Sequence, residues 1–238
     1  YDEEGNLLYV SGEKGNLDSN IKNPVALKYF TVEDSDFCEK ICKSIQYQLI
    51  MAGFHEEYLE RNNLKTYQTK CDSKETYLTR PDLGRVFDDE TAAKIKAECI
   101  SDPDVQIVVS DGLSSSAVEA NIDAVLPAIY NGLKATNLKV GTPFFVKYGR
   151  VGAEDSVAKI LNAKVTVILL GERPGLATSS SLSAYIVYGG YPGIPEANRT
   201  VVSNIHKAGT PPVEAGAYIA ELCKQMFDKK ASGLDLKA

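Results

Sequence analysis

Apolar residues along the chain follow two alternating patterns, most clearly from residue 103 onward. Short runs that are mostly apolar predict strands, and these runs cover 76–79, 105–109, 140–146, 165–170 and 185–188. Between the runs, apolar residues recur at every third or fourth position, which is the spacing of one helix face. Strands that alternate with helices in this way are typical of an α/β fold.

Helix-start and helix-stop signals divide the periodic segments. The expected helices cover 32–52, 54–62, 89–99, 116–133, 153–161 and a last segment that begins at Pro211 after the cap Thr210. In the fourth of these helices, Ser116 and Glu119 form a capping box, and Pro127 is predicted to kink or split the helix. We therefore expect a Rossmann-like, mostly parallel sheet with helices on both faces, preceded by a small helical N-terminal region.

The same patterns predict three parts along the chain. Residues 1–30, in which Gly and Asn interrupt short apolar pieces, are expected to form an extended or flexible arm. Residues 31–75 are expected to form the helical N-terminal region, and residues 76–238 the α/β domain.

Three loops rich in Gly and polar residues follow the predicted strands. They contain Asp111-Gly112, residues 148–151 and residues 171–175. Ligands of α/β sheets bind at the carboxyl ends of the strands, so we expect these loops to converge on one rim. The turn at Gly112 either accepts an anion at the following helix N-terminus or is a plain strand–helix turn, and the second reading is favoured.

The sharpest local feature is Gly171-Glu172-Arg173-Pro174-Gly175. A carboxylate and a guanidinium lie side by side on a turn that Pro stiffens. Glu172 is a candidate to accept hydrogen bonds from the amide or hydroxyl groups of a ligand, because binding residues gather on rigid loops. The alternative is a structural turn with a surface ion pair.

Composition removes several classes of function. The 238 residues include 26 Lys and Arg against 32 Asp and Glu, and the net charge of -6 argues against nucleic-acid binding. No apolar run approaches the ~20 residues that span a membrane. The two His and five Cys, which form no C-x-x-C pair, argue against a zinc site or a disulfide framework and favour a cytoplasmic setting. Phosphate-binding loops and a G-x-S-x-G elbow are missing from the sequence.

Two further groups have a chemical and a plain interpretation. His206 lies in a motif one residue away from D-x-H-x-x-G, a pattern that offers His to cobalt, but Asn204 stands where the Asp would be. We therefore do not assign His206 to cobalt. Cys38 and Cys42 lie one helical turn apart, and small apolar packing residues are favoured over a metal pair.

Several motifs in fixed order carry a resemblance to a known family. They are YLTRPDLGR (77–85), VSDGLS (109–114), KVGTPFFV (139–146), YGRV (148–151), GERPGL (171–176), SNIH (203–206), GTPPVEA (209–215) and KASG (230–233). With these motifs the chain resembles the small (light) subunit family of ethanolamine ammonia-lyase, which depends on adenosylcobalamin. The resemblance covers residues 76–238 almost without gaps, and residues 1–75 match poorly.

The resemblance implies a hetero-oligomer that converts ethanolamine to acetaldehyde and ammonia by a radical mechanism. In this family the large (heavy) barrel subunit holds ethanolamine, and the small subunit caps the adenosylcobalamin between them. The family's contacts to the cofactor correspond to Val151, Glu172 and Val201, and Val201 replaces the Cys that the family carries there. No catalytic or metal-ligating residue is expected in this chain. The resemblance also implies a cytoplasmic location inside a bacterial microcompartment that serves ethanolamine degradation.

Two other classes of function are weighed against this one. The chain could be a non-catalytic interaction module of a multi-protein scaffold with the same fold. It could also be a free-standing nucleotide-binding enzyme, although the missing phosphate loops count against this reading.

Overall fold

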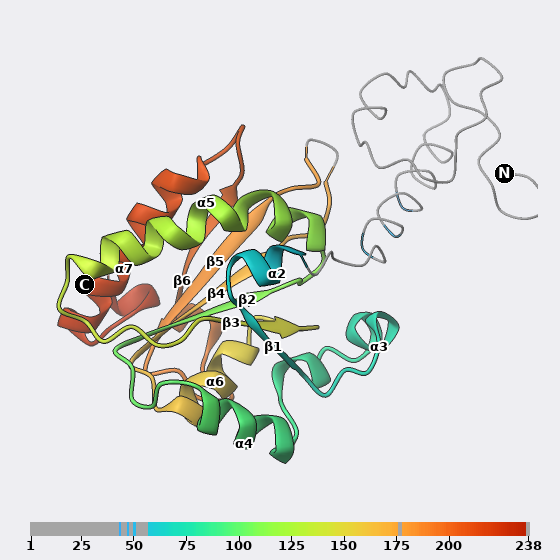
Figure 1. The fold of residues 1–238 in the computed structure, drawn as a ribbon, viewed down its shortest axis with the longest axis horizontal. Coiled ribbons are helices and arrows are strands. Elements are labelled where there is room, and N and C mark those ends of the chain that lie inside the picture. The colour runs from blue at the N-terminus through green and yellow to red at the C-terminus, as the bar shows by residue number, and fades with distance from the viewer. Residues whose placement is uncertain (1–42, 44–46, 48–49, 51–56, 176–177, 237–238) are drawn as a thin grey trace, which may run out of the picture.

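The structure, a computed structural model, describes residues 43, 47, 50, 57–175 and 178–236. In this part of the chain, six strands form one sheet in the order β1-β3-β2-β4-β5-β6. The strands are β1 (Lys65–Gln68), β2 (Val105–Ser110), β3 (Phe144–Lys147), β4 (Val165–Gly171), β5 (Leu182–Tyr188) and β6 (Arg199–Ile205). Helices lie on both sides of the sheet, which confirms the predicted α/β class (Figure 1).

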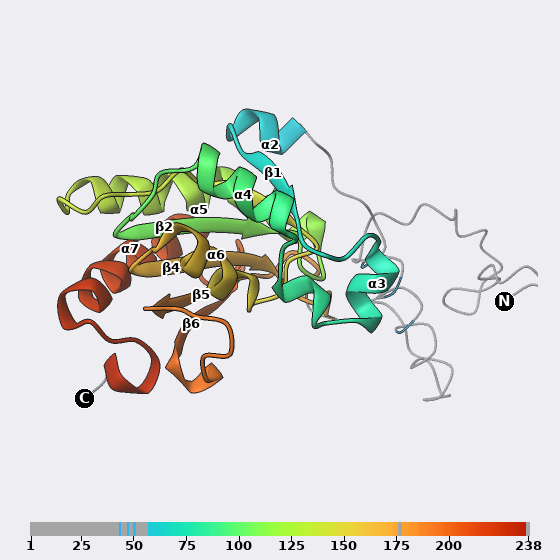
Figure 2. The same ribbon diagram turned by 90° about the horizontal axis from the view of Figure 1, so that it is seen from below.

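The sheet has a parallel half and an antiparallel edge. The strands β1, β3, β2 and β4 run parallel to one another, whereas β5 pairs antiparallel with β4 and β6 antiparallel with β5. The arrowheads of β2 and β4 point one way in Figure 2, and that of β5 points the other way. The expectation of a mostly parallel sheet is confirmed.

Two layers of helices cover the sheet (Figure 1). The long helices α5 (Ser115–Lys134) and α7 (Pro212–Lys229) cover one face, and α4 (Asp89–Glu98) and α6 (Ala153–Leu161) cover the other. We call these the α5/α7 face and the α4/α6 face. The shorter elements are α2 (Glu57–Arg61), α3 (Lys74–Thr79) and the 3-10 helices η2 (Leu83–Arg85), η3 (Glu196–Asn198) and η4 (Gly233–Leu236).

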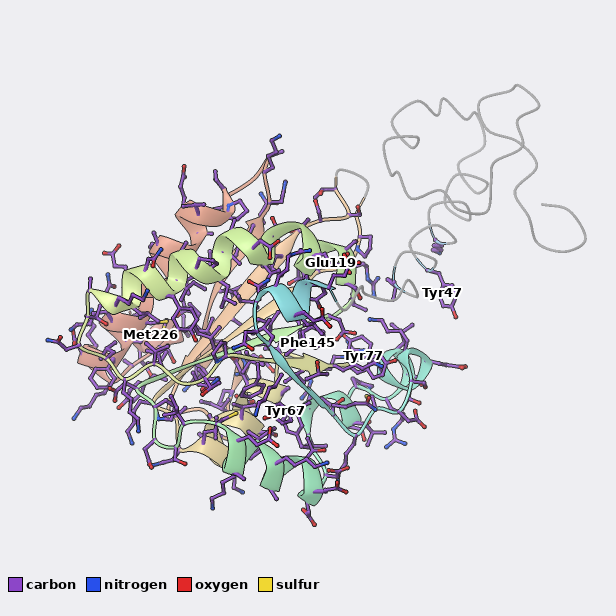
Figure 3. All side chains as sticks on the ribbon, in the orientation of Figure 1. Tyr47, Tyr67, Tyr77, Glu119, Phe145 and Met226 are labelled. Carbon is purple, nitrogen blue, oxygen red and sulfur yellow. The ribbon has the colours of Figure 1, made fainter. Side chains whose placement is uncertain are left out.

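Successive residues of β4 show how the two layers divide the core. Val167 and Leu169 join the apolar cluster on the α5/α7 face, whereas Ile168 and Leu170 join the cluster on the α4/α6 face. This alternation follows from the two-residue period of a strand. In Figure 3, Met226 lies on the α7 side of the sheet and Tyr67 on the α4 side. Both faces are therefore apolar, as the near-continuous apolar runs predict.

Two of the expected strands are wrong in whole or in part. Residues 76–79 belong to helix α3, because the Ser73 hydroxyl caps the helix by accepting a hydrogen bond from the Thr76 N–H. The strand expected over 140–146 is limited to Phe144–Lys147, and Val140 forms only an isolated bridge with Val105. Pro143 precedes the strand and has no N–H to donate to a ladder.

The starts of the two long helices also differ from expectation. Ser114, rather than Ser116, caps α5, and its hydroxyl accepts from the Ala117 N–H. The predicted split at Pro127 is wrong, because α5 continues through this residue, which lies on the exposed side of the helix. α7 begins at Pro212 with Pro211 at the cap position, one residue later than expected.

Two edge strands were not expected from the sequence. β1 lies within 31–75, the range expected to be helical, and it pairs in register with β3. β6 pairs with β5 at the other edge of the sheet. Of the helix expected over 54–62, Glu57–Arg61 is helical. The arm at 1–30 and Cys38 and Cys42 lie outside the described residues, as does nearly all of the helix expected over 32–52. None of the described helices is both long enough and apolar enough to cross a lipid bilayer.

Candidate functional site

The carboxyl ends of β2, β3 and β4 meet at one rim, as the sequence predicts. The Tyr148 N–H after β3 donates to Asp111 Oδ1 after β2 at 2.8 Å. The Leu113 N–H donates to the Gly171 carbonyl at the end of β4, also at 2.8 Å. Backbone and side-chain hydrogen bonds therefore join the three loops to one another.

Gly112 lets two of these loops approach closely. Its φ is +54°, and a Cβ added here would lie 2.3 Å from the Gly171 carbonyl oxygen. Only glycine accommodates both the positive φ and the close contact. The Gly112 carbonyl also accepts from Lys74 Nζ at 2.6 Å, so this turn is tied into the protein. The structure shows a tight strand–helix turn at this position.

A buried ion pair holds helix α3 against the rim. Lys74 Nζ lies 3.4 Å from Asp111 Oδ2, and the side chains are 11% and 2% exposed. Burial raises the pKa of Asp111, and the nearby Lys74 charge opposes that shift. Burial likewise lowers the pKa of Lys74, against the effect of Asp111. The Lys74–Asp111 ion pair thus holds the loop after β2 in place against helix α3.

Arg150, next to Val151, packs against the same helix. Its guanidinium lies 4.1 Å from the centre of the Tyr77 ring and donates to the Tyr77 carbonyl at 2.6 Å. The loop that carries Val151 is therefore held by stacking and by hydrogen bonding. Figure 3 shows Tyr77 near α3, at the rim end of the sheet.

Two of the three residues expected to contact cofactor lie on either side of one tyrosine. Glu172 directly follows β4, and its Oε1 accepts from the Tyr185 hydroxyl of β5 at 2.9 Å. Val201 of β6 is the direct register partner of Tyr185, so the two side chains share a sheet face. No Glu172–Arg173 ion pair forms within the described residues. A cross-strand hydrogen bond takes the place of the surface ion pair weighed from the sequence.

Val151 lies on the same face of the sheet as this group. Val151 and Tyr185 are both partly buried against the apolar cluster of the α4/α6 face. A cleft of about 430 Å³ on this side is lined by Gly152, the residue after Val151, and by Arg199, two residues before Val201. Val151, in the loop after β3, and Val201, on β6, thus belong to segments that border the same cleft.

Sequence reasoning missed Tyr185 and Arg199. Arg199 is 7% exposed and bridges two residues of α6, with Nη1 2.7 Å from Glu154 Oε1 and Nη2 2.7 Å from Asp155 Oδ2. Its Nε also donates to Glu196 at 2.8 Å. Glu154 and Asp155 look like helix-dipole carboxylates in the sequence, but both are buried partners of a distant arginine. No local spacing marks a pair 45 residues apart.

His206 forms a local turn with both of its ring nitrogens. Nε2 lies 2.8 Å from Asn204 Oδ1, and Nδ1 accepts from the Ala208 N–H at 3.2 Å. Asn204 adopts a φ of 60° in this turn. This geometry agrees with the structural interpretation of His206. Among the described residues, no group of three or more His, Cys, Asp or Glu is arranged to hold a metal ion.

The fold defines an α/β protein in which three loops meet at the carboxyl ends of parallel strands, and an antiparallel hairpin extends the sheet on one side. Residues 30–237 match the family described as "Ethanolamine ammonia-lyase light chain (EutC)". The chain therefore belongs to the ethanolamine ammonia-lyase light chain family, which confirms the resemblance drawn from the motifs. The match begins at residue 30, so the expectation that residues 1–75 match poorly is wrong for residues 30–75.

Individual relatives agree with this assignment. The chain is 58% identical over 188 residues to a protein of Clostridium tetani and 55% identical over 188 residues to one of Fusobacterium nucleatum, each called "Ethanolamine ammonia-lyase small subunit". A protein of Listeria monocytogenes with the same name is 54% identical over 182 residues. The matches cover 76–79% of this chain. The chain spans 62–64% of the length of these relatives.

Proposed function

We propose that this chain acts as the small subunit of an adenosylcobalamin-dependent ethanolamine ammonia-lyase, in which it caps the cofactor against a large (heavy) subunit that holds ethanolamine. Membership in the light chain family supports the enzyme, and the relatives' name "small subunit" supports a larger partner. A cytoplasmic microcompartment as its location stays a prediction.

The placement of Glu172 and Val201 around Tyr185 is the observation that carries the cofactor part of the proposal. A corrinoid is a flat macrocycle with apolar faces and a fringe of amide groups. Val201 is 48% exposed, and an apolar ring face would find contact there. The Glu172 carboxylate is an acceptor for amide N–H groups.

A buried polar atom near this group also fits a ligand rich in amides. Ser183 lies two residues before Tyr185 on β5, so the two side chains share a face. Its hydroxyl is buried and has no hydrogen-bond partner within the described residues. Buried hydroxyls are normally paired, so an unpaired one beside Tyr185 is consistent with a polar partner outside this chain.

The chemistry is divided between the cofactor and the protein. When bound, adenosylcobalamin supplies the radical with which ethanolamine is converted to acetaldehyde and ammonia. The residues of this chain bind and orient: Val151 and Val201 give apolar contact that excludes water, and Glu172 accepts hydrogen bonds. The rim network beneath them keeps the loop of Val151 in place.

The test is cobalamin binding by the complex of this chain with its large subunit, comparing Val151→Glu and Glu172→Ala with the unaltered chain. Both variants are expected to weaken binding, and Val151→Glu more strongly, because it places a charge against the cofactor or the partner. Val213→Glu is the matched control, since Val213 is 60% exposed on α7, which covers the opposite face. Its cobalamin affinity is expected to stay unchanged.

The same experiment separates the scaffold alternative. A chain that co-purifies with the large subunit, but whose variants Val151→Glu and Glu172→Ala leave cobalamin affinity and turnover unaltered, would be an interaction module rather than a cofactor cap. That outcome would overturn the assignment of Val151 and Glu172 as contact residues.

A further inference from the structure

We propose that Tyr185 is a positioning residue for the cofactor: it holds the Glu172 carboxylate in one orientation and, with Val201, forms the wall beside it. This inference rests on the proposed function. The sequence motifs that indicate the family do not include Tyr185, so the structure alone points to this residue.

The hydrogen bond between Tyr185 and Glu172 has a defined direction. The Tyr185 hydroxyl lies 2.9 Å from Glu172 Oε1, and a carboxylate can only accept. Burial raises the pKa of Tyr185, and the negative charge of Glu172 raises it further. The phenol therefore keeps its proton at neutral pH and acts as the donor.

Hydrogen bonds hold both the backbone and the side chain of Glu172. Its backbone N–H donates to the Ser181 carbonyl at 3.0 Å, and its side chain is held by Tyr185 through Oε1. The other carboxylate oxygen, Oε2, has no hydrogen-bond partner in the described part of the chain. One oxygen thus anchors the side chain, and the other is left for a donor on a ligand. An acceptor held in place binds more tightly because less rotational freedom is lost.

The aromatic ring of Tyr185 places the apolar part of the site beside the acceptor. Tyr185 is half-buried on the α4/α6 face and lies opposite Val201 across the β5–β6 ladder. Directly opposed side chains in an antiparallel pair are in contact distance. A single residue of β5 therefore joins the carboxylate after β4 to the exposed valine of β6.

The test compares Tyr185→Phe with Tyr188→Phe in the complex with the large subunit, using cyanocobalamin as the binding probe and adenosylcobalamin for turnover. Tyr188 is the matched control, because it lies on the same strand but packs against the α5/α7 cluster. Loss of a hydrogen bond to a charged group should weaken cyanocobalamin binding by about tenfold in Tyr185→Phe. The apparent KM for adenosylcobalamin should rise by a similar factor at unchanged kcat, and Tyr188→Phe should change neither.

A double-mutant cycle shows whether Tyr185 acts through Glu172. In the Glu172→Ala background, Tyr185→Phe is expected to have no further effect on affinity, because its acceptor is gone. An equal loss in both backgrounds would overturn the positioning role. If Tyr185→Phe impairs assembly of the complex, Glu172→Gln weakens the same hydrogen bond without altering β5 and should raise the Kd for cyanocobalamin. Unchanged affinity in Glu172→Gln would then contradict the proposal.

Different results would overturn the proposed function and the role of Tyr185. An unaltered complex that does not bind cyanocobalamin would overturn the proposed function. An unaltered complex that binds cyanocobalamin, together with a Tyr185→Phe variant of the same affinity, would overturn only the role of Tyr185.

Discussion

The parallel and antiparallel halves of the sheet differ in how they are covered. Every residue of β2 and β4 is buried, because helices pack on both faces of these strands. In β6, three of seven residues are exposed and another three are buried, and Val201 is one of the exposed residues. The parallel half thus forms a buried base for the rim loops, whereas the outer strand of the hairpin is partly exposed.

A single buried cation connects the two halves. Arg199, the first residue of β6, pairs with Glu154 and Asp155 at the start of α6. Helix α6 packs on β4, so this cluster fixes the hairpin against the parallel half. The position of Val201 relative to Val151 depends on the same contact.

The largest expected effect on stability comes from replacing Arg199, which connects the two halves of the sheet. Arg199→Met should lower the free energy of unfolding by about 3–5 kcal/mol, because it leaves two buried carboxylates without their cation. Urea denaturation measures the change. Arg173→Met, at an exposed arginine, is the control and should change stability by less than about 0.5 kcal/mol. Equal stabilities of the two variants would mean that the cluster does not fasten the hairpin.

Substitution of one valine in each half tests how much the burial of the two halves differs. Val109→Ala in β2, at a residue with no exposed surface, should cost about 2 kcal/mol from lost burial and the resulting cavity. Val201→Ala in β6, where the side chain is 48% exposed, should cost less than about 0.5 kcal/mol. Thermal unfolding of both variants tests the comparison, which fails if Val201→Ala is as damaging as Val109→Ala.

The smallest expected effect concerns pH. Burial raises the pKa of Glu154 well above the usual value of 4.5, against the attraction of Arg199, so the native state binds a proton that the unfolded state has released. Stability from this group is therefore present at low pH and is lost as the pH rises from about 4.5 through the raised pKa. The amide side chain that Glu154→Gln introduces cannot titrate. The free energy of unfolding of this variant, relative to that of the unaltered protein, should therefore increase as the pH rises from about 4.5 through the raised pKa of Glu154.

Urea denaturation at several pH values follows this difference. Asp155 and Glu196, the other two carboxylates that pair with Arg199, are present in both proteins, so their contributions largely cancel in the comparison. A difference between Glu154→Gln and the unaltered protein that does not vary with pH would contradict a raised pKa for Glu154.

Strand prediction succeeded where burial is uniform and failed where it alternates. The runs at 105–109 and 165–170 mark β2 and β4 because strands covered on both faces need apolar residues at every position. β6 begins Arg-Thr-Val-Val-Ser-Asn and β1 reads Lys-Thr-Tyr-Gln, so neither carries an apolar run. Edge strands of this composition are stabilised by ladder hydrogen bonds to a neighbour, which is information that a local window does not contain.

The candidate site shows the same division. The convergence of the rim loops could be predicted, since glycine-rich turns after parallel strands meet at one edge. The sequence marked Glu172 as a candidate acceptor on one of these loops, and its role stays a prediction. Val151 and Val201 came from the family motifs, and their roles stay predictions. Tyr185 could not be found from the sequence, because a tyrosine within an apolar strand looks like a core residue.

The sequence alone determined the α/β class, the buried central strands, the turns at Gly112 and Gly171, and the family. These depend on local periodicity, on backbone freedom at particular residues and on motifs in fixed order. Only the tertiary structure decided that β5 and β6 run antiparallel, that Tyr185 donates to Glu172 beside Val201, and that Arg199 pairs with Glu154 and Asp155. Strand register and burial create these neighbours, and both arise from contacts between residues far apart in the chain.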